Sequence, residues 1–252
     1  ASLTNAGYTI TTEPVVTDYK CTYRTTDEVN TDKIIYSNSA EATFSTIFDG
    51  VSIAKTDLSS IVLDGFTSVG NQAFTACTNL QSVDISLSSS LSLGSGTIST
   101  FAFRDCSKLS SVTMNTNVRR IAFGAFLGNK PLTSVVIPTS VIAIGQVAFQ
   151  LSSNLSHVVI HSDVVDQQNN AFDRIASNPS LYYYDTTSKT YYVGTLDSNN
   201  KIVKTDQEVT DASTITSNSD ITDANLTNAG YTITTEQVVT DYKCTYRTTA
   251  DV

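Results

Sequence analysis

The chain has 252 residues, of which 40% are apolar and 15% are charged, and its net charge is −9. An acidic chain without a basic cluster lacks the positive surface that phosphate binding needs, which argues against a nucleic-acid partner. Every apolar run is shorter than the roughly 18–20 residues of a membrane-spanning helix. The polar residues are mainly Ser, Thr and Asn, a composition typical of extracellular β-rich proteins.

The beginning of the chain predicts β structure. Tyr19, Cys21 and Tyr23 alternate with polar residues, which is the period of a half-buried strand. A short apolar run, Ile34–Tyr36, follows. We therefore assign residues 1–44 to an N-terminal β segment.

The two ends of the chain repeat each other. Residues 1–29 recur as residues 224–252, at an offset of 223, and four of the 29 aligned pairs differ: Ser2/Asn225, Pro14/Gln237, Asp27/Ala250 and Glu28/Asp251. No fold requires such near-identity, so it indicates a recent duplication. We interpret residues 224–252 as the start of the next unit of a tandem array. The alternative is one central domain flanked by two copies of a small module.

A shorter repeat fills the middle of the chain. The pair Ala-Phe recurs at spacings of 29, 23, 23 and 23 residues, as Ala73-Phe74, Ala102-Phe103, Ala125-Phe126, Ala148-Phe149 and Ala171-Phe172. A fixed period of this length is the signature of a repeat architecture. The longer first spacing predicts a surface loop within residues 86–99. Residues 45–70 form a degenerate opening rung, as expected for the capping end of a stack.

Each rung carries Leu, Val and Ile or Met at fixed positions after the phenylalanine, as in Leu132, Val135 and Ile137. One rung cannot bury this apolar edge alone, so neighbouring rungs stack and share a core. The Leu-x-x-Val-x-Ile segment predicts a strand that pairs in parallel with the next rung. The Ala-Phe segment predicts a tight turn or a single helical turn on the other side.

This pattern resembles the BspA-like (Treponema pallidum type) leucine-rich repeats. The resemblance covers about residues 58–172 and is carried in the third rung by Leu132, Val135, Ile137-Pro138, Ser140-Val141, Ile144-Gly145 and Ala148-Phe149. The family's usual Cys after the phenylalanine is met by Cys77 and Cys106 and replaced by Asn129 and Ser152. The resemblance implies a surface-exposed or secreted protein, and some members are adhesins.

The fold class is therefore a β-rich leucine-rich-repeat solenoid over residues 45–180, with about five to six 23-residue rungs, a parallel sheet and small antiparallel β segments at its flanks. Tyr-rich stretches separated by turn-forming tetrapeptides follow, and they predict a β meander that closes the open end. We assign residues 181–223 to this meander and a linker, because residues 205–225 are polar.

Strand alternation places one set of side chains outside the core, on the exposed face of the parallel sheet. This face is small, neutral and partly apolar, which suits a protein or glycan partner. Its candidate binding residues are Asp84, Thr113, Asn115, Val136, His157, Val159 and His161. The ordinary interpretation of the two histidines, as solvent-exposed polar residues, stands beside this one.

The chain shows little sign of chemistry. Ser156 precedes His157, but strand alternation predicts that their side chains point to opposite faces. Cys77 and Cys106 hold equivalent positions where a disulfide is geometrically possible, although buried thiols are favoured. Asp197–Asn200 is a better hairpin turn than a calcium site. Catalytic and cofactor motifs do not occur, so we predict no catalytic residue, no metal, no cofactor and no enzyme activity.

The expected protein is extracellular or located at a cell surface. It is a unit of a tandem array that acts in adhesion or in protein or glycan binding. The alternative is a structural subunit of an extracellular fibre, sheath or filament. Self-association would then run end to end through the terminal β segments.

Overall fold

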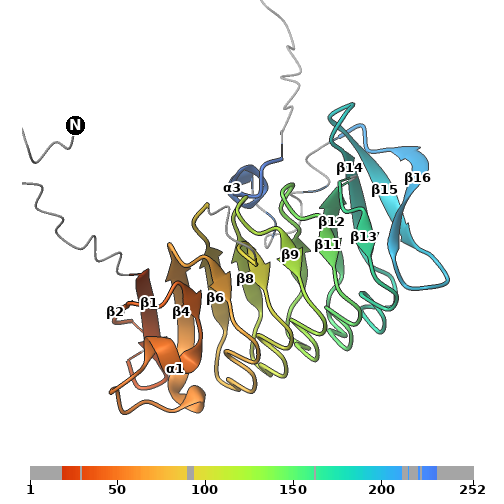
Figure 1. Ribbon diagram of the computed structural model, residues 1–252. Coiled ribbons are helices and arrows are strands. Elements are labelled where there is room, and N and C mark those ends of the chain that lie inside the picture. The colour runs from red at the N-terminus through yellow and green to blue at the C-terminus, as the bar shows by residue number, and fades with distance from the viewer. Residues whose placement is uncertain are drawn as a thin grey trace, which may run out of the picture.

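The computed structural model of the chain describes residues 19–28, 30–89, 94–161, 163–211, 215, 221 and 223–231. Within these residues the chain coils into a solenoid whose rungs stack in one direction (Figure 1). Each regular rung gives one strand to a long parallel sheet and a short strand to a second sheet, and the Ala-Phe turn follows. The predicted solenoid, with antiparallel segments at both flanks, is confirmed.

The long sheet is built from the predicted Leu-x-x-Val-x-Ile segments. Its rung strands are β4 (Leu58–Asp64), β6 (Ser82–Ser86), β8 (Ser111–Met114), β10 (Ser134–Val136) and β12 (His157–His161). The parallel register pairs equivalent positions, such as Val83 with Val112 and Val135 with Val158. The hydrogen-bonded ladder is interrupted once, because β8 and β10 belong to separate sheets.

A second parallel sheet of short strands runs along the other side of the core. It consists of β3 (Glu41–Ala42), β5 (Ser68–Val69), β7 (Thr97–Ile98), β9 (Arg120–Ile121), β11 (Ala143–Ile144) and β13 (Asp166–Gln167). The sequence pattern predicted only one strand in each rung. Two-residue strands carry too little alternation to be recognised by periodicity.

The Ala-Phe segments are tight turns, and their phenylalanine rings form a continuous stack. Neighbouring ring centroids, from Phe74 to Phe172, lie 5.2–5.4 Å apart with interplanar angles of 5–9°. The backbone stacks with the same period, because the Phe74 N–H donates to the Ala102 carbonyl at 2.7 Å. The equivalent bond recurs in the following rungs, up to Phe149 and Ala171.

The position three residues after the phenylalanine is buried in the first four rungs, where Cys77, Cys106, Asn129 and Ser152 stand. Cys21, Cys77 and Cys106 are buried free thiols, and burial raises the pKa of Cys77 to about 12. Where Asn129 replaces the cysteine, its amide accepts from Cys106 N and donates to the Phe103 and Phe126 carbonyls, each at 3.0 Å. The predicted preference for thiols over a disulfide is confirmed.

A hairpin covers the first end of the solenoid. β1 (Tyr19–Thr25) pairs antiparallel with both β2 (Lys33–Ser37) and β4. The helix α1 (Phe44–Ile47) and the 3-10 helix η2 (Lys55–Asp57) follow, and Phe48 meets the Tyr23 ring edge-on at 5.0 Å. β1 thus shares a sheet with the first rung. The division of the chain at residue 44 stays a prediction.

The predicted meander extends the long sheet at the other end. β14 (Ser180–Asp185) pairs in parallel with β12, and β15 (Thr190–Leu196) and β16 (Ile202–Glu208) continue antiparallel. The β15–β16 turn replaces a missing rung, because the Asn199 carbonyl accepts from Asn170 N at 2.7 Å. Residues 205–225 are not simply a polar linker: β16 reaches Glu208, and Ile215 and Ile221 are buried.

The phenylalanine stack predicts which rung substitution is costly. Phe126→Ala opens a cavity between two stacked rings and should lower the free energy of unfolding by about 3–5 kcal/mol. Phe123→Ala in the same rung is the matched control, because Phe123 is 40% exposed, and it should cost about 1 kcal/mol or less. Urea titrations followed by circular dichroism measure both. Equal losses in the two variants would contradict a stability that depends on the stack.

Candidate functional site

The structure places the predicted binding residues on one face of the long sheet but in two groups. Asp84 on β6 lies beside Thr113 on β8, whereas Val136 on β10 lies beside Val159 on β12. The interruption between β8 and β10 separates the groups. We call the outer face of β4, β6 and β8 the open half, and the outer face of β10, β12 and β14 the covered half.

The covered half is buried under a later part of the chain. The helix α3 (Asp223–Asn228) and the three residues Ala229–Tyr231 lie over the middle of the solenoid (Figure 1). A second hydrophobic cluster, separate from the main core, forms there from Val159, Tyr184, Tyr191, Ile215, Ile221, Leu226, Ala229 and Tyr231. The expectation that Val159 and His161 are exposed is therefore wrong, because they are 0% and 1% exposed.

Hydrogen bonds fix this segment to the loop that follows β10. Thr139 donates to the Ala229 carbonyl from its backbone N at 2.8 Å and from its hydroxyl at 3.2 Å. The Tyr231 hydroxyl donates to the Ile137 carbonyl at 2.5 Å. Sequence analysis missed Thr139, Leu226 and Tyr231 as parts of this face. The available signal was the repetition of their segment at both ends of the chain.

His161 lies at the edge of the covered half. Burial lowers its pKa, and this shift is partly opposed by the Pro138 carbonyl and the charge of Asp163. Its Nδ1 accepts from Asp163 N at 3.2 Å, and its ring lies 6.4 Å from that of Tyr231 in a T-shaped arrangement. The buried ring is thus a neutral packing partner of the segment, rather than the exposed polar group that the sequence suggested.

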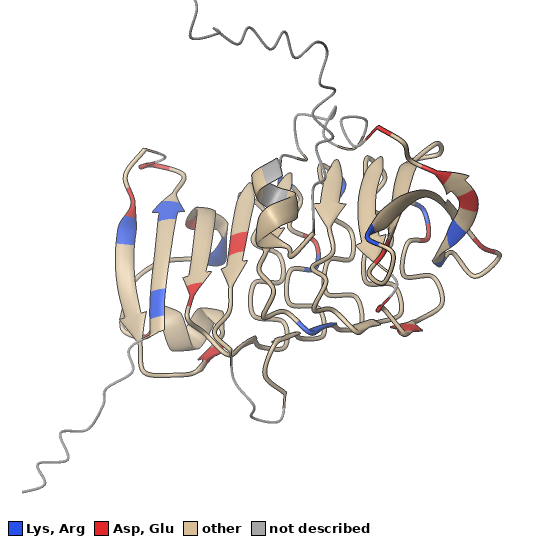
Figure 2. Cartoon of the chain, turned by 90° about the horizontal axis from the view of Figure 1, so that it is seen from above, with Lys and Arg blue, Asp and Glu red and all other residues tan. Residues whose placement is uncertain are grey.

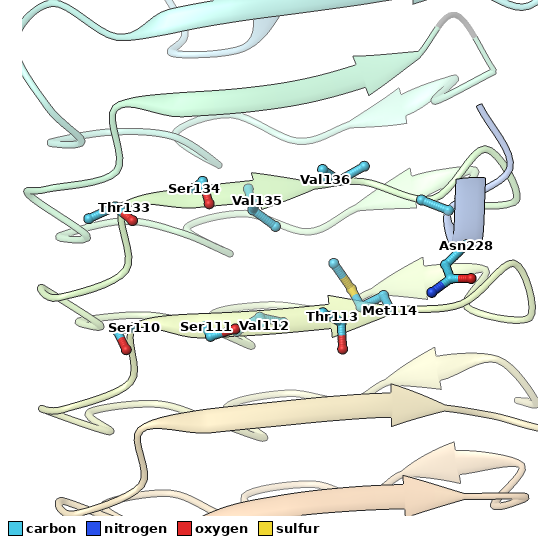
Figure 3. A pocket seen from close by; sticks show the side chains of 11 residues that line it. Ser110, Ser111, Val112, Thr113, Met114, Thr133, Ser134, Val135, Val136 and Asn228 are labelled. Atoms are coloured by element: carbon cyan, nitrogen blue, oxygen red, sulfur yellow. The ribbon is translucent and has the colours of Figure 1, made fainter. Parts of the chain in front are cut away.

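A groove of about 440 Å³ lies where the covered half meets the open half. Figure 3 shows it between β8 and β10, with Asn228 of α3 at one end. Its lining has hydroxyl, amide and apolar groups and no charge: Ser110, Ser111, Val112, Thr113, Met114, Thr133, Ser134, Val135, Val136, Asn228 and Ala229. Figure 2 shows that charged residues lie mainly toward the two ends of the solenoid.

The remaining predicted residues take local roles. Asn115 holds the turn after β8, because its amide donates to the Leu87 carbonyl at 2.8 Å and accepts from Asn117 N at 3.2 Å. Asp84 accepts from the Ser86 hydroxyl at 3.0 Å. Of the predicted set, only Thr113 and Val136 line the groove.

Ser156 and His157 do not point apart as predicted. The Ser156 hydroxyl lies 2.9 Å from His157 Nδ1, since Ser156 precedes β12 and strand alternation does not govern it. The same hydroxyl lies 3.4 Å from the Thr133 carbonyl. Within the described ranges, no group of three or more His, Cys, Asp or Glu residues could hold a metal ion. The absence of enzyme activity stays a prediction.

Comparison with known proteins identifies the repeat. The family model described as "BspA type leucine rich repeat region" matches residues 27–95 and 45–179, in six copies. A search of curated proteins found no match. In the part of the chain that the structure describes, no helix is long and apolar enough to span a bilayer.

Three solved structures are similar to parts of the chain. A leucine rich cell surface protein from Faecalibacterium prausnitzii A2-165 is 20% identical with a TM-score of 0.43, over 52% of this chain and 33% of that chain. The T. pallidum leucine rich repeat protein is 26% identical with a TM-score of 0.41, over 49% and 63%. The pneumococcal vaccine antigen PcpA is 16% identical with a TM-score of 0.48, over 61% and 35%. The chain thus matches less than two thirds of each of these proteins.

The buried histidine predicts a dependence of stability on pH. Because the folded-state pKa of His161 is lowered, the folded chain binds fewer protons than the unfolded chain in mildly acidic solution. The contribution of His161 to the free energy of unfolding is complete above its unfolded pKa of about 6.5. It is lost as the pH falls through the folded pKa. Urea titrations at pH 7 and pH 5 measure the free energy of unfolding. Its decrease between the two pH values should be smaller for His161→Asn than for the wild type. Identical losses would contradict this role.

Proposed function

The chain belongs to the BspA-type leucine-rich repeat family, and we propose that it acts at a cell surface, or outside the cell, as a protein-binding module. The observation that carries this proposal is the uncharged groove between β8 and β10. Adhesion is the physiological role that such binding would serve.

The groove favours an uncharged segment of a protein partner. Ser111, Thr113 and Ser134 supply hydroxyls that both donate and accept hydrogen bonds. Met114 and Val136 add apolar surface. None of the lining residues is aromatic, so a sugar ring would find no aromatic face to stack on, and a protein segment is the better fit than a glycan.

A charge placed in the groove tests this proposal. Thr113→Lys should weaken binding to a protein ligand by about tenfold or more, because it puts a long, charged side chain into an uncharged groove. The matched control is Val62→Lys, since Val62 pairs in register with Asp84 and lies on the same face outside the groove. Surface plasmon resonance against purified extracellular-matrix proteins and neutral glycans measures both. A ligand whose affinity falls equally in both variants, or in neither, would contradict binding at the groove.

A structural role is the second candidate, because the outer strand of one sheet is apolar. β2 is the edge strand of its ladder, and Ile34 and Tyr36 on it are 55% and 59% exposed. Exposed apolar edge strands are ready to pair with another chain. This edge would support a fibre or filament that grows end to end.

The edge strand gives this alternative its own test. If the chain assembles through β2, wild-type chain at high concentration forms linear assemblies in negative-stain electron microscopy, and Ile34→Lys with Tyr36→Lys abolishes them. Val165→Lys is the matched control, because Val165 is 84% exposed but lies in the loop between β12 and β13. A wild-type chain that remains monomeric would rule out assembly through β2.

A further inference from the structure

The segment that covers the outer face has a duplicate in the same chain. Leu226–Tyr231 reads Leu-Thr-Asn-Ala-Gly-Tyr, and Leu3–Tyr8 reads the same. We propose that this hexapeptide is a docking element, that the covered half is its receptor, and that Leu3–Tyr8 occupies the receptor of another copy of the chain. The inference does not depend on the ligand-binding role proposed above.

The hexapeptide encodes its own bound conformation. The Tyr231 N–H donates to the Leu226 carbonyl, and the Gly230 N–H donates to the Thr227 carbonyl, both at 3.0 Å. These bonds form a Schellman motif, which ends a helix with a left-handed residue and brings the flanking apolar side chains together. Gly230 is that residue, with a φ of +86°. The sequence of Leu3–Tyr8 contains all the residues of this motif.

The receptor contacts the hexapeptide through two tyrosines and two backbone groups. The Tyr231 ring lies 5.1 Å from that of Tyr184 and 6.1 Å from that of Tyr191. The Tyr231 hydroxyl donates to the Ile137 carbonyl. The Ala229 carbonyl accepts from Thr139. Burial raises the pKa of Tyr231 well above its usual range. The tyrosine is therefore an enclosed anchor of the kind that dominates the energy of interfaces.

The glycine is required by the receptor as well as by the backbone. A Cβ added at Gly230 would clash with the Thr139 hydroxyl and would lie 2.9 Å from Thr116 Cγ2. A left-handed backbone also disfavours any side chain at this position. The hexapeptide and the receptor thus fit each other closely, as expected for a specific contact.

The position of the duplicate identifies its receptor. Ten residues, 232–241, separate the docked hexapeptide from Tyr242, the counterpart of Tyr19 at the start of β1. Ten residues, 9–18, likewise separate Leu3–Tyr8 from this chain's β1. A hexapeptide docked on one unit therefore precedes the next unit by a connection of at most about 40 Å. This chain's receptor already holds Leu226–Tyr231, so Leu3–Tyr8 is left to dock on the receptor of another copy.

Emptying the receptor of the full-length chain tests the proposal. Leu226→Asp with Tyr231→Ala displaces the internal hexapeptide, and Leu3–Tyr8 of other copies should then bind. Sedimentation velocity should show a monomeric wild type and a displaced variant that forms concentration-dependent oligomers. Adding Leu3→Asp and Tyr8→Ala removes the second donor and should restore the monomer. Circular dichroism confirms that each variant is folded.

A milder pair of substitutions and a peptide test the same contact. Gly230→Val should also promote oligomers, and Gly7→Val should reverse them. A labelled peptide of residues 1–10 should bind the four-substitution variant in fluorescence anisotropy, and its Gly7→Val form should bind about tenfold more weakly or worse. Displaced variants that stay monomeric, oligomers that persist without Leu3 and Tyr8, or a peptide that does not bind would each overturn the proposal. These readouts measure assembly and need no ligand in the groove, although displacing the segment also removes Asn228 and Ala229 from the groove lining.

Discussion

The hydrogen bond from each phenylalanine N–H to the alanine carbonyl of the next rung sets the geometry of the whole solenoid. It holds successive Ala-Phe turns in register, so that the rings of Phe74 to Phe172 stack with a constant separation. A rung that shifted by one residue would turn its apolar side chains out of the core. The buried Asn129, which caps the Phe103 and Phe126 carbonyls, maintains the same alignment where the usual cysteine is replaced.

Because the core is complete without the outer face, that face is available for other contacts. The main core takes the inward residues of each strand, such as Val158 and Ile160, whereas Val159 between them belongs to a separate cluster. The two clusters share a strand but have different partners. The covered half can therefore lose its segment without emptying the core, as expected of a surface that accepts an exchangeable element.

The sequence predicted the features that follow from the repeat period. It did not predict that a distant segment of the chain covers part of the outer face. A 23-residue repeat of Leu, Val, Ile and Phe determines the stack, the long sheet and its parallel register. Alternation also predicted that Val159 and His161 leave the core, which is correct, but not that Ile215, Ile221 and the segment Leu226–Tyr231 cover them. Periodicity assigns a side chain to a face and carries no information about what lies over that face. The two-residue strands, such as β11, were too short to show a period.

The duplicated hexapeptide links the two proposed surfaces. Asn228 belongs to the docked Leu226–Tyr231 and also lines the groove between β8 and β10. The groove is therefore completed by residues from the start of the second copy. If Leu3–Tyr8 docks on a preceding unit, Asn5 takes the place of Asn228 there, since the two hexapeptides are identical. Each unit would then finish the binding groove of the unit before it, so that assembly of the array and formation of its ligand site are one event.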